Sequence, residues 1–421
     1  MGKVLYHIFI TLYPLLARLA ALFNSKARKW VTGRKDIMNT IAEAVKPLDA
    51  GTVWVHCSSL GEFEQGRPLL EKIKTLHPQY KIILTFFSPS GYEVQKKYSK
   101  ADYIFYLPMD SPANAARFYD IIRPSLVIFV KYEFWNYFLK EAHKRKIPLL
   151  LVSGIFRKSQ PFFAWYGGFY RQMLQYFSFL FVQNEASLQL LEGIGITHAS
   201  ISGDTRFDRV LEIAATHKNI DGIEDFCEGK TVIVAGSTWT EDDEELDHYA
   251  NTHRDYRFII APHDITEERL KECDALYKYS IRYSTYLQLL KSGIPTQEVN
   301  TLIIDNIGLL GYLYRYGKVC FVGGGFGGDG VHNVLEPAVY GRPVLFGPVY
   351  DKFFEAVELL DAEGAFTVEG ALELEKQLDI LLSDATAYKK ACGNAGNYVK
   401  NKSGATATIV NYIQEKRLLT N

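Results

Sequence analysis

From Gly51 onward the chain alternates short runs rich in β-branched and aromatic residues with longer segments of helical periodicity. This alternation is typical of parallel sheets built from βαβ units. In the first half the expected strands are 52–57, 81–87, 103–108, 125–130, 148–154 and 179–184. In the second half they are 231–237, 257–263, 301–306, 318–325 and 342–348. We therefore expect an α/β protein with one doubly wound sheet in each half of the chain.

A length of 421 residues exceeds one ordinary core and favours two domains. The break is expected between Ile201 and Lys230, around the polar stretch 216–228, in which we expect no strand. The predicted parts are an N-terminal segment 1–24, a first domain 25–215 and a second domain 216–421, with the last helix free to cross back. Two Rossmann-like domains that face each other across a cleft form the GT-B layout.

Charge and cysteine usage narrow the functional class. The formal net charge is −1 and the sequence pI is about 6.8, so no overall field attracts the chain to nucleic acid. The cysteines are far apart and show no zinc-like spacing, which predicts reduced and mostly buried thiols in a cytoplasmic enzyme body. They are Cys57, Cys227, Cys273, Cys320 and Cys392.

Residues 4–23 form a nearly continuous apolar stretch, about the length that spans a ~30 Å hydrocarbon layer. Basic residues follow at once, with no acidic residue before Asp36, which favours a cytoplasmic carboxyl-side flank. A cleaved secretory signal would carry its charge in front of the apolar stretch, so we exclude it. Pro14 and Arg18 weaken a full span, and three alternatives stay open: a spanning anchor, a helix in the interface, and a buried core helix.

Open parallel sheets bind ligands beyond the carboxyl ends of their strands, so these positions are the candidate site. After the first strand comes the segment 56–62, HCSSLGE, which leads into a helical pattern. The helix macrodipole favours the charged form of Glu62, which can then accept a proton. The small Ser59 and Gly61 indicate close approach of a ligand. The alternative is a surface glutamate that only complements the helix dipole.

The fourth strand is followed by a charged and aromatic cluster, KYEFWN at 131–136. A sugar ring can stack on Tyr132 or Trp135, and Lys131 can meet an anionic substrate. The competing interpretation is an ordinary ion pair of Lys131 with Glu133 beside aromatic packing. Together with the first segment this predicts substrate contacts from Ser59, Gly61, Lys131, Glu133 and Arg206.

The second half holds a glycine-rich loop, FVGGGFGGDGVHNVLEP at 321–337. Glycines such as Gly324 and Gly325 allow the backbone to approach a phosphate, and a helix expected to start near His332 supplies N–H donors. His332 and Asn333 lie about one turn from Glu336, so they can face the same ligand. The alternative is a glycine-rich turn without a ligand.

This loop differs from two better-known phosphate-binding patterns. No Lys followed by Ser or Thr closes it as in a P-loop, and it lies too late in the chain for a dinucleotide fingerprint. A nucleoside monophosphate with its ribose on Glu336 fits it better. Other strand ends of the same half add possible donor contacts from Ser237, Thr238, His263 and Asp305, although such residues are also common helix caps.

With these segments in view, the chain resembles the bacterial 3-deoxy-D-manno-octulosonic acid (Kdo) transferases, glycosyltransferase family 30. HCSSLGE, KYEFWN and VHNVLEPAVYGRPVLFGP are similar to segments of that family, and GSTW and APH occur in the same order. Leu309 is a departure, because many relatives carry Glu there.

The resemblance implies transfer of Kdo from CMP-Kdo to a lipid A precursor at the cytoplasmic face of the inner membrane, without a metal or other cofactor and with inversion. It also implies that Glu62 is the general base and that Glu336, Asn333, Ser237 and Thr238 belong to the CMP site. The alternatives are another GT-B lipid glycosyltransferase, a nucleotide-sugar epimerase, or an inactive module that binds a sugar nucleotide or a lipid.

Overall fold

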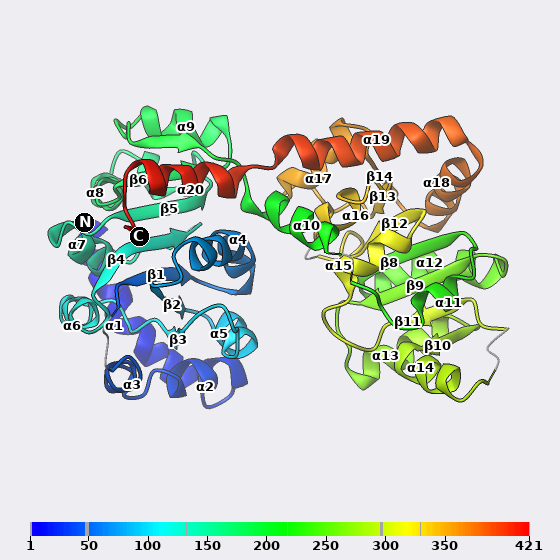
Figure 1. The fold of residues 1–421 in the computed structure, drawn as a ribbon, viewed down its shortest axis with the longest axis horizontal. Coiled ribbons are helices and arrows are strands. Elements are labelled where there is room, and N and C mark those ends of the chain that lie inside the picture. Colours follow the sequence, from blue (N-terminus) through cyan, green and yellow to red (C-terminus); the bar gives the residue numbers. More distant parts are fainter. Residues whose placement is uncertain are drawn as a thin grey trace. The chain divides into compact units, whose positions relative to one another are not determined.

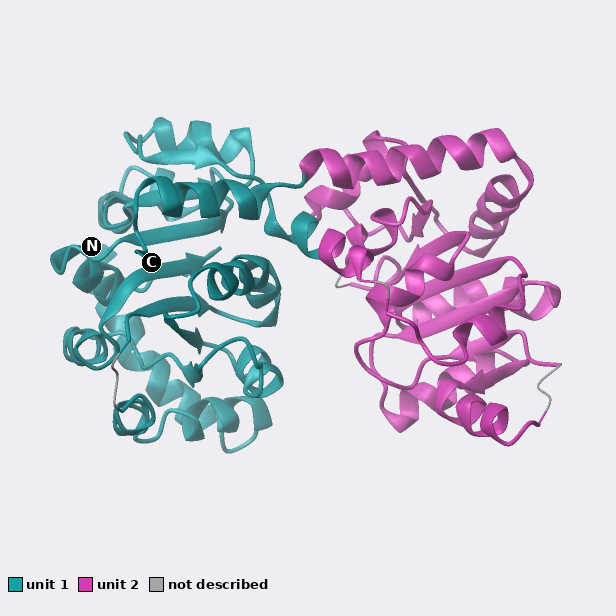
Figure 2. Ribbon diagram, viewed as in Figure 1, with its two compact units in different colours: residues 1–209, 403–421 teal, residues 210–402 magenta. Residues whose placement is uncertain are grey.

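The structure of the chain is a computed structural model that describes residues 2–46, 50–131, 133–216, 218–294, 298–328 and 330–420. It divides into two compact units, residues 1–209 with 403–421 (unit 1) and residues 210–402 (unit 2) (Figure 2). The division falls six residues before the boundary expected after residue 215, inside a helix. The C-terminal segment returns to unit 1.

Unit 1 is built on a seven-stranded parallel sheet with the strand order β3-β2-β1-β4-β5-β6-β7 (Figure 1). Its strands are β1 Thr52–Cys57, β2 Lys81–Phe86, β3 Tyr103–Tyr106, β4 Pro124–Val130, β5 Leu149–Gly154, β6 Phe179–Val182 and β7 Ala199–Ile201. Its helices are α1 Gly2–Ala20, α2 Ser25–Thr32, α3 Ile37–Ala44, α4 Leu60–Leu76, α5 Pro89–Gln95, α6 Pro112–Ile122, α7 Asn136–Lys144, η1 Pro161–Phe163, α8 Gly168–Gln175, α9 Glu185–Glu192 and α20 Ala405–Glu415. Helix α10, Thr205–Ala215, begins in unit 1 and ends in unit 2.

Helices cover both faces of this sheet because its central strands are apolar on both sides. In β4, Leu126 and Ile128 belong to one core cluster, while Val127 and Phe129 belong to the other. Such continuous apolar runs are characteristic of parallel strands buried on two faces. Helix α20 contributes Ile409, Val410 and Ile413 to the first of these clusters.

Unit 2 repeats the architecture with a second seven-stranded parallel sheet, in the order β10-β11-β9-β8-β12-β13-β14. Its strands are β8 Val232–Thr238, β9 Arg257–Pro262, β10 Ser280–Arg282, β11 Thr301–Ile303, β12 Val319–Val322, β13 Val344–Phe346 and β14 Ala365–Thr367. Its helices are α11 Ile223–Cys227, α12 Thr240–Thr252, α13 Glu267–Leu276, α14 Tyr283–Lys291, α15 Leu310–Leu313, η2 Tyr314–Tyr316, α16 Leu335–Ala338, α17 Phe354–Asp361, α18 Ala371–Ser383 and α19 Ala385–Lys402. Two doubly wound α/β units of this kind form the GT-B fold, as expected.

Every strand expected from the sequence is present, with bounds that differ by a few residues, and three further strands were not expected. These are β7, β10 and β14, each three residues long and each at the edge of its sheet. An edge strand is paired on one side only, so it needs neither length nor a continuous apolar run. The five cysteines are free thiols and four of them are buried, as expected.

Helix α1 packs one side against unit 1 and exposes the other. Tyr6 and Ile10 are buried, and the Tyr6 hydroxyl donates to the buried carboxylate of Asp110. The helix is long and apolar enough to cross a membrane, a property that it shares with signal sequences and with core helices of soluble proteins. The buried core helix is excluded, because most of the apolar residues of this segment are exposed. They are Val4, Leu5, Ile8, Phe9, Leu12, Leu15, Leu16, Leu19, Leu22 and Phe23.

Candidate active site

Each sheet has a central place where the direction of winding reverses. In unit 1 it lies between β1 and β4, and in unit 2 between β8 and β12. Loops that leave two adjacent strands in opposite directions open a crevice at their carboxyl ends, where ligands of doubly wound proteins bind. Most of the candidate site residues predicted from the sequence lie at or after the carboxyl ends of these four strands.

The loop after β1 presents Glu62 in the first turn of α4. Ser59 is the residue before the helix, and its hydroxyl donates to the Glu62 carboxylate. Glu62 is half-buried, so it keeps access to solvent or to a ligand. Gly61 is exposed, and a Cβ added there would meet only the Ser59 hydroxyl, at 3.9 Å. This loop therefore holds an accessible carboxylate with open space beside it.

A second carboxylate, Glu133, follows β4 and is bound more tightly. Burial by itself raises its pKa, but hydrogen bonds from His56, Ser58 and Trp135 outweigh burial and hold the pKa below its usual range. His56 Nε2 lies 3.4 Å from the Glu133 carboxylate, and His56 Nδ1 lies 2.9 Å from the Thr85 hydroxyl. Glu133 is thus a fixed negative charge. Ser58 and Ser59, adjacent in the chain, bind Glu133 and Glu62 respectively.

Two cations lie in the same unit beside Gln65 of α4. With its amide oxygen facing them, Gln65 accepts from Lys131 Nζ at 3.1 Å and from Arg206 Nε at 3.2 Å. Lys131 has a backbone φ of 66°, a strained conformation for a non-glycine residue and one that clusters at functional sites. The fold therefore brings Lys131 and Arg206, 75 positions apart in the sequence, to one amide.

The aromatic residues of the same loop do not form a stacking platform within the described structure. Trp135 is buried and packs against Phe87, with ring centroids 4.6 Å apart, and against Phe9. Its faces are therefore occupied by protein, not by a sugar. Tyr132, the other predicted stacking residue, lies outside the described residues.

In unit 2 the glycine-rich loop after β12 is packed backbone against backbone. A Cβ on Gly323 would lie 2.6 Å from Thr238 Cα, and a Cβ on Gly325 would lie 2.6 Å from the Gly347 nitrogen. Gly324 has a φ of 92°, which favours glycine. These glycines are required by close approach of the protein's own backbone. The loop is thus fixed before any ligand arrives.

Three aromatic rings, two that follow strands and one from the loop itself, pack together here. His263 follows β9, and its ring lies 4.4 Å from that of His332, at 12°, and 4.6 Å from that of Trp239. The Trp239 indole N–H donates to His332 Nε2 at 3.1 Å. Two predicted donor-site residues, His263 and His332, are therefore in contact, and Trp239 joins them.

Asn333 and Glu336 are also brought together, but not on the helix that was expected. Asn333 Nδ2 donates to Glu336 Oε1 at 3.1 Å, and Asn333 Oδ1 accepts from the Leu335 N–H. Helix α16 begins at Leu335 rather than near His332 and ends at Ala338. Asn333 therefore caps this short helix, because its carbonyl satisfies an N–H that has no partner inside it.

The remaining predicted donor residues differ in their contacts. Thr238 is fully buried at the end of β8, and Ser237 beside it has a positive φ of 55°. Asp305 binds Ser284 at the start of α14, accepting from its N–H at 3.0 Å and from its hydroxyl at 2.5 Å. Its contacts are those of a helix cap, the role that the sequence pattern left open for it.

Sequence reasoning missed several residues that hold these sites. His56 and Gln65 support unit 1, and Trp239 and Asp242 support unit 2. His56 and Trp239 stand inside or beside the motifs but carry no spacing rule that marks them. Gln65 and Asp242 lie three residues after Glu62 and Trp239 on helices, so helical periodicity was the signal available.

Residues 27–209 match the family described as 3-deoxy-D-manno-octulosonic-acid transferase (kdotransferase). A 3-deoxy-D-manno-octulosonic acid transferase of Aquifex aeolicus is 29% identical over 342 residues, which cover 79% of this chain and 86% of that protein. The family match lies within unit 1, whereas the match to the Aquifex aeolicus protein is longer than either unit and extends into both.

Two further comparisons bear on length and fold. A bifunctional glycosyltransferase/methyltransferase of Fusobacterium nucleatum is 26% identical over 88% of this chain, and the match covers only 56% of that relative's own length. The crystal structure of UDP-GlcNAc 2-epimerase from Neisseria meningitidis has a TM-score of 0.61 at 17% identity and covers 86% of this chain and 100% of the epimerase chain. At that identity the likeness concerns the fold alone.

Proposed function

We propose that this chain, which belongs to the family of 3-deoxy-D-manno-octulosonic acid (Kdo) transferases, moves Kdo from CMP-Kdo to a hydroxyl of a lipid A precursor, with inversion. The identity of the transferred sugar follows from the family. The donor nucleotide, the lipid acceptor and the stereochemistry are our inference. The observation that carries it is the half-buried Glu62, held by Ser59 at the winding reversal of unit 1.

In the proposed reaction Glu62 accepts the proton of the acceptor hydroxyl. The hydroxyl oxygen forms a bond to the anomeric carbon of Kdo as the bond from that carbon to the CMP phosphate oxygen breaks. The electron pair leaves with the phosphate. Base catalysis of this kind contributes ~10²- to 10⁴-fold. The charged side chains of unit 1 have separate roles in this proposal. Glu62 accepts the proton, and Lys131 and Arg206 attract the carboxylate or phosphate groups of the substrates.

Unit 2 is assigned to the donor. Its glycine-rich loop and the stacked rings of His263 and His332 suit a nucleoside monophosphate, and Glu336 with Asn333 offers acceptors and donors to a ribose diol. The departing CMP carries one phosphate, whose charge hydrogen-bond donors can stabilise. We therefore propose that transfer needs no metal ion. Activity should remain within twofold of its starting value after exhaustive EDTA treatment. A loss of activity that added Mg²⁺ restores would contradict this proposal.

We further propose that α1 attaches the protein to the cytoplasmic face of the inner membrane by lying in its interface. Tyr6 is bound on one side by Asp110 and by the Asn136 N–H at 3.0 Å, so this side of the helix is taken up by unit 1. The opposite side is apolar and exposed, and basic residues follow it at Lys26, Arg28 and Lys29. Such an arrangement is characteristic of interfacial helices on anionic lipid.

Two measurements test this attachment. Replacing Leu12, Leu16 and Leu19 by Ser should release most of the protein from anionic vesicles, because each buried leucine contributes roughly 1.5–3 kcal/mol. A Lys3→Cys variant should react with an impermeant maleimide in inside-out vesicles and not in spheroplasts. Labelling in spheroplasts alone would show that α1 spans the membrane.

The function itself is tested by mass spectrometry of the products formed from CMP-Kdo and a purified lipid A precursor. We expect one added Kdo mass or more, with release of CMP. Interconversion of UDP-GlcNAc and UDP-ManNAc without any Kdo product would favour an epimerase. Binding of CMP-Kdo without turnover, by protein with its membrane helix intact and lipid present, would favour an inactive module.

A further inference from the structure

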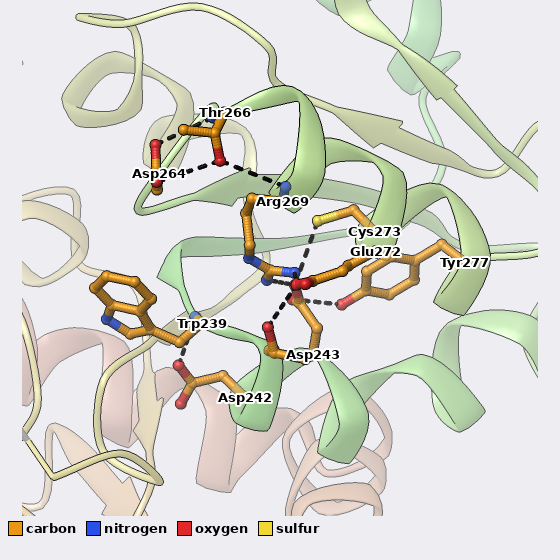
Figure 3. A network of polar contacts seen from close by, with 10 residues as sticks. Trp239, Asp242, Asp243, Asp264, Thr266, Arg269, Glu272, Cys273 and Tyr277 are labelled. Atoms are coloured by element: carbon orange, nitrogen blue, oxygen red, sulfur yellow. Dashed lines mark hydrogen bonds and ion pairs between the residues drawn. The ribbon is translucent and has the colours of Figure 1, made fainter.

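Two adjacent aspartates, Asp242 and Asp243, begin helix α12 and are both fully buried (Figure 3). Their carboxylates point to different partners. Asp243 binds side chains of α13 and of the residue that follows it, accepting from Arg269 and from the Tyr277 hydroxyl at 2.8 Å. Asp242 instead accepts from backbone, from the Trp239 N–H at 2.8 Å and from the Gly324 N–H at 2.8 Å. Asp243 therefore stabilises helix packing, whereas Asp242 holds the glycine-rich loop.

A buried carboxylate is costly unless donors surround it. Asp242 lies in the first turn of α12, where the helix macrodipole favours negative charge. Burial nevertheless raises its pKa to about 6, against the opposing effect of the Gly324 and Trp239 N–H groups. The charge is therefore retained at neutral pH at a cost in stability, and a costly buried charge calls for a role beyond packing.

The contacts around Asp242 fix both ends of the loop. At its start, the Gly323 N–H donates to Gly236 O at 2.9 Å, and a Cβ on Gly323 would lie 2.8 Å from the Asp242 carboxylate. At its end, the His332 N–H donates back to Gly323 O at 3.0 Å. The turn that leads from β8 into α12 thus reaches residues 323, 324 and 332.

Trp239 adds a contact that defines the chemistry of His332. An indole N–H only donates, so His332 Nε2 must accept, and the proton of the neutral ring is on Nδ1. Trp239 also donates its backbone N–H to Asp242. Trp239 and Asp242 therefore act as one unit, because Asp242 sets the backbone of Trp239 and Trp239 sets the ring of His332.

We propose that Trp239 and Asp242 are positioning residues for the donor phosphate, which hold the backbone of the glycine-rich loop and the His332 ring in the arrangement that binds CMP. The inference rests on the assignment of unit 2 to the donor. Neither residue needs to touch the ligand. Each acts through Gly324 or His332, the parts of the loop that it contacts.

The test measures CMP affinity, kcat and KM of the full chain in detergent. It uses two variants of Asp242, one without and one with an acceptor oxygen in the side chain. Asp242→Ala removes the acceptor of both N–H groups, and CMP affinity should fall about tenfold or more, the effect of losing one to two net hydrogen bonds. Asp242→Asn keeps an acceptor oxygen and should restore affinity to within about threefold of the wild type. KM for CMP-Kdo should rise in Asp242→Ala, with a smaller change in kcat.

Tyr277→Phe is the matched control, because it removes a hydrogen bond to the neighbouring Asp243 while leaving the loop contacts intact. It should lower the melting temperature without changing CMP affinity. Trp239→Phe keeps ring stacking and loses the indole N–H, and should weaken CMP binding by about threefold to tenfold. Equal CMP affinities in Asp242→Ala, Tyr277→Phe and the wild type would overturn the proposal.

Hydrogen exchange supplies a second readout if Asp242→Ala is less stable. We expect faster exchange in peptides covering 323–328 and 330–332 of the variant, with unchanged exchange in β8 and β9. Faster exchange throughout unit 2 would show a structural role only and contradict the proposal. Failure of the donor assignment itself has a different signature, because wild-type protein would then not bind CMP at all.

Discussion

The two candidate sites are held by different kinds of contact, although each lies at the winding reversal of the same type of sheet. In unit 1 side chains hold side chains, as Ser59 holds Glu62 and as His56 and Trp135 hold Glu133. In unit 2 the held group is the backbone of the glycine-rich loop, which lies against backbone where Gly325 meets Gly347 and is bound by a carboxylate where the Gly324 N–H donates to Asp242. A base must accept and release a proton, which a side-chain carboxylate such as that of the half-buried Glu62 can do. A phosphate site needs fixed dipoles, which a rigid loop provides.

The largest effect should come from Glu62, to which the proposed mechanism assigns proton transfer in unit 1. Glu62→Gln keeps the size and the contact with Ser59 but cannot accept a proton, so kcat should fall ~10²-fold or more. CMP affinity, which we propose to depend on unit 2, should stay within twofold. Steady-state kinetics and calorimetry on one folded variant measure both. Near wild-type turnover would remove Glu62 from the mechanism and leave the acceptor without an identified base.

The next effect concerns stability and belongs to unit 2. Because burial raises the pKa of Asp242 from 3.8 to about 6, the folded state favours its protonated form. The resulting stabilisation is present below pH 3.8 and is lost as pH rises to about 6, by about 3 kcal/mol in total. Asp242→Asn does not titrate, so its stability relative to the wild type should improve by that order between pH 4 and pH 7.

Urea unfolding at several pH values measures this difference, and an Asp243→Asn variant shows whether the neighbouring buried carboxyl behaves alike. The pKa of Asp243 is also raised by burial, but the Arg269 guanidinium lowers it again. Its pH dependence should therefore be weaker. A stability difference between Asp242→Asn and the wild type that does not vary with pH would mean that folding leaves the pKa of Asp242 unchanged, and that its buried charge carries no cost in stability.

Substitution of Glu336 tests whether side chains also contribute to CMP binding at the glycine-rich loop of unit 2. A ribose diol bound to Glu336 would lose its acceptor in Glu336→Ala, and the unpaired hydroxyls should cost ~1–3 kcal/mol of CMP affinity. Glu336→Gln should lose less, because one oxygen remains. Calorimetry with CMP and with cytidine separates the ribose contact from the phosphate contact. Unchanged CMP affinity in Glu336→Ala would show that unit 2 is not the donor site, or that Glu336 is not part of it.

The same contrast explains what the sequence revealed. Long strands buried on two faces have an unmistakable pattern, so the central strands and the fold class were predicted, while the edge strands β7, β10 and β14 were not. Motifs placed Glu62, Glu133 and His332 at strand ends. Their supports were not predicted, because contacts such as Gln65 with Arg206 or Asp242 with Gly324 join residues far apart in the chain. The α16 start was misplaced because Asn333 serves as its cap.

The smallest expected effect is at Gly61, and a matched glycine in unit 2 makes it informative. A Cβ at Gly61 enters open space, so Gly61→Ala should change stability by less than ~0.5 kcal/mol. In Gly325→Ala the Cβ would lie 2.6 Å from the Gly347 backbone nitrogen, so stability should fall by ~1–3 kcal/mol, and CMP affinity with it. Any loss in Gly61→Ala should therefore appear in KM for the lipid acceptor, because its added methyl occupies space beside Glu62 that a substrate would use. If Gly61→Ala is fully active toward the acceptor while remaining stable, the open space at this glycine is not part of the acceptor site, and the contrast between an open loop in unit 1 and a closed loop in unit 2 has no functional meaning.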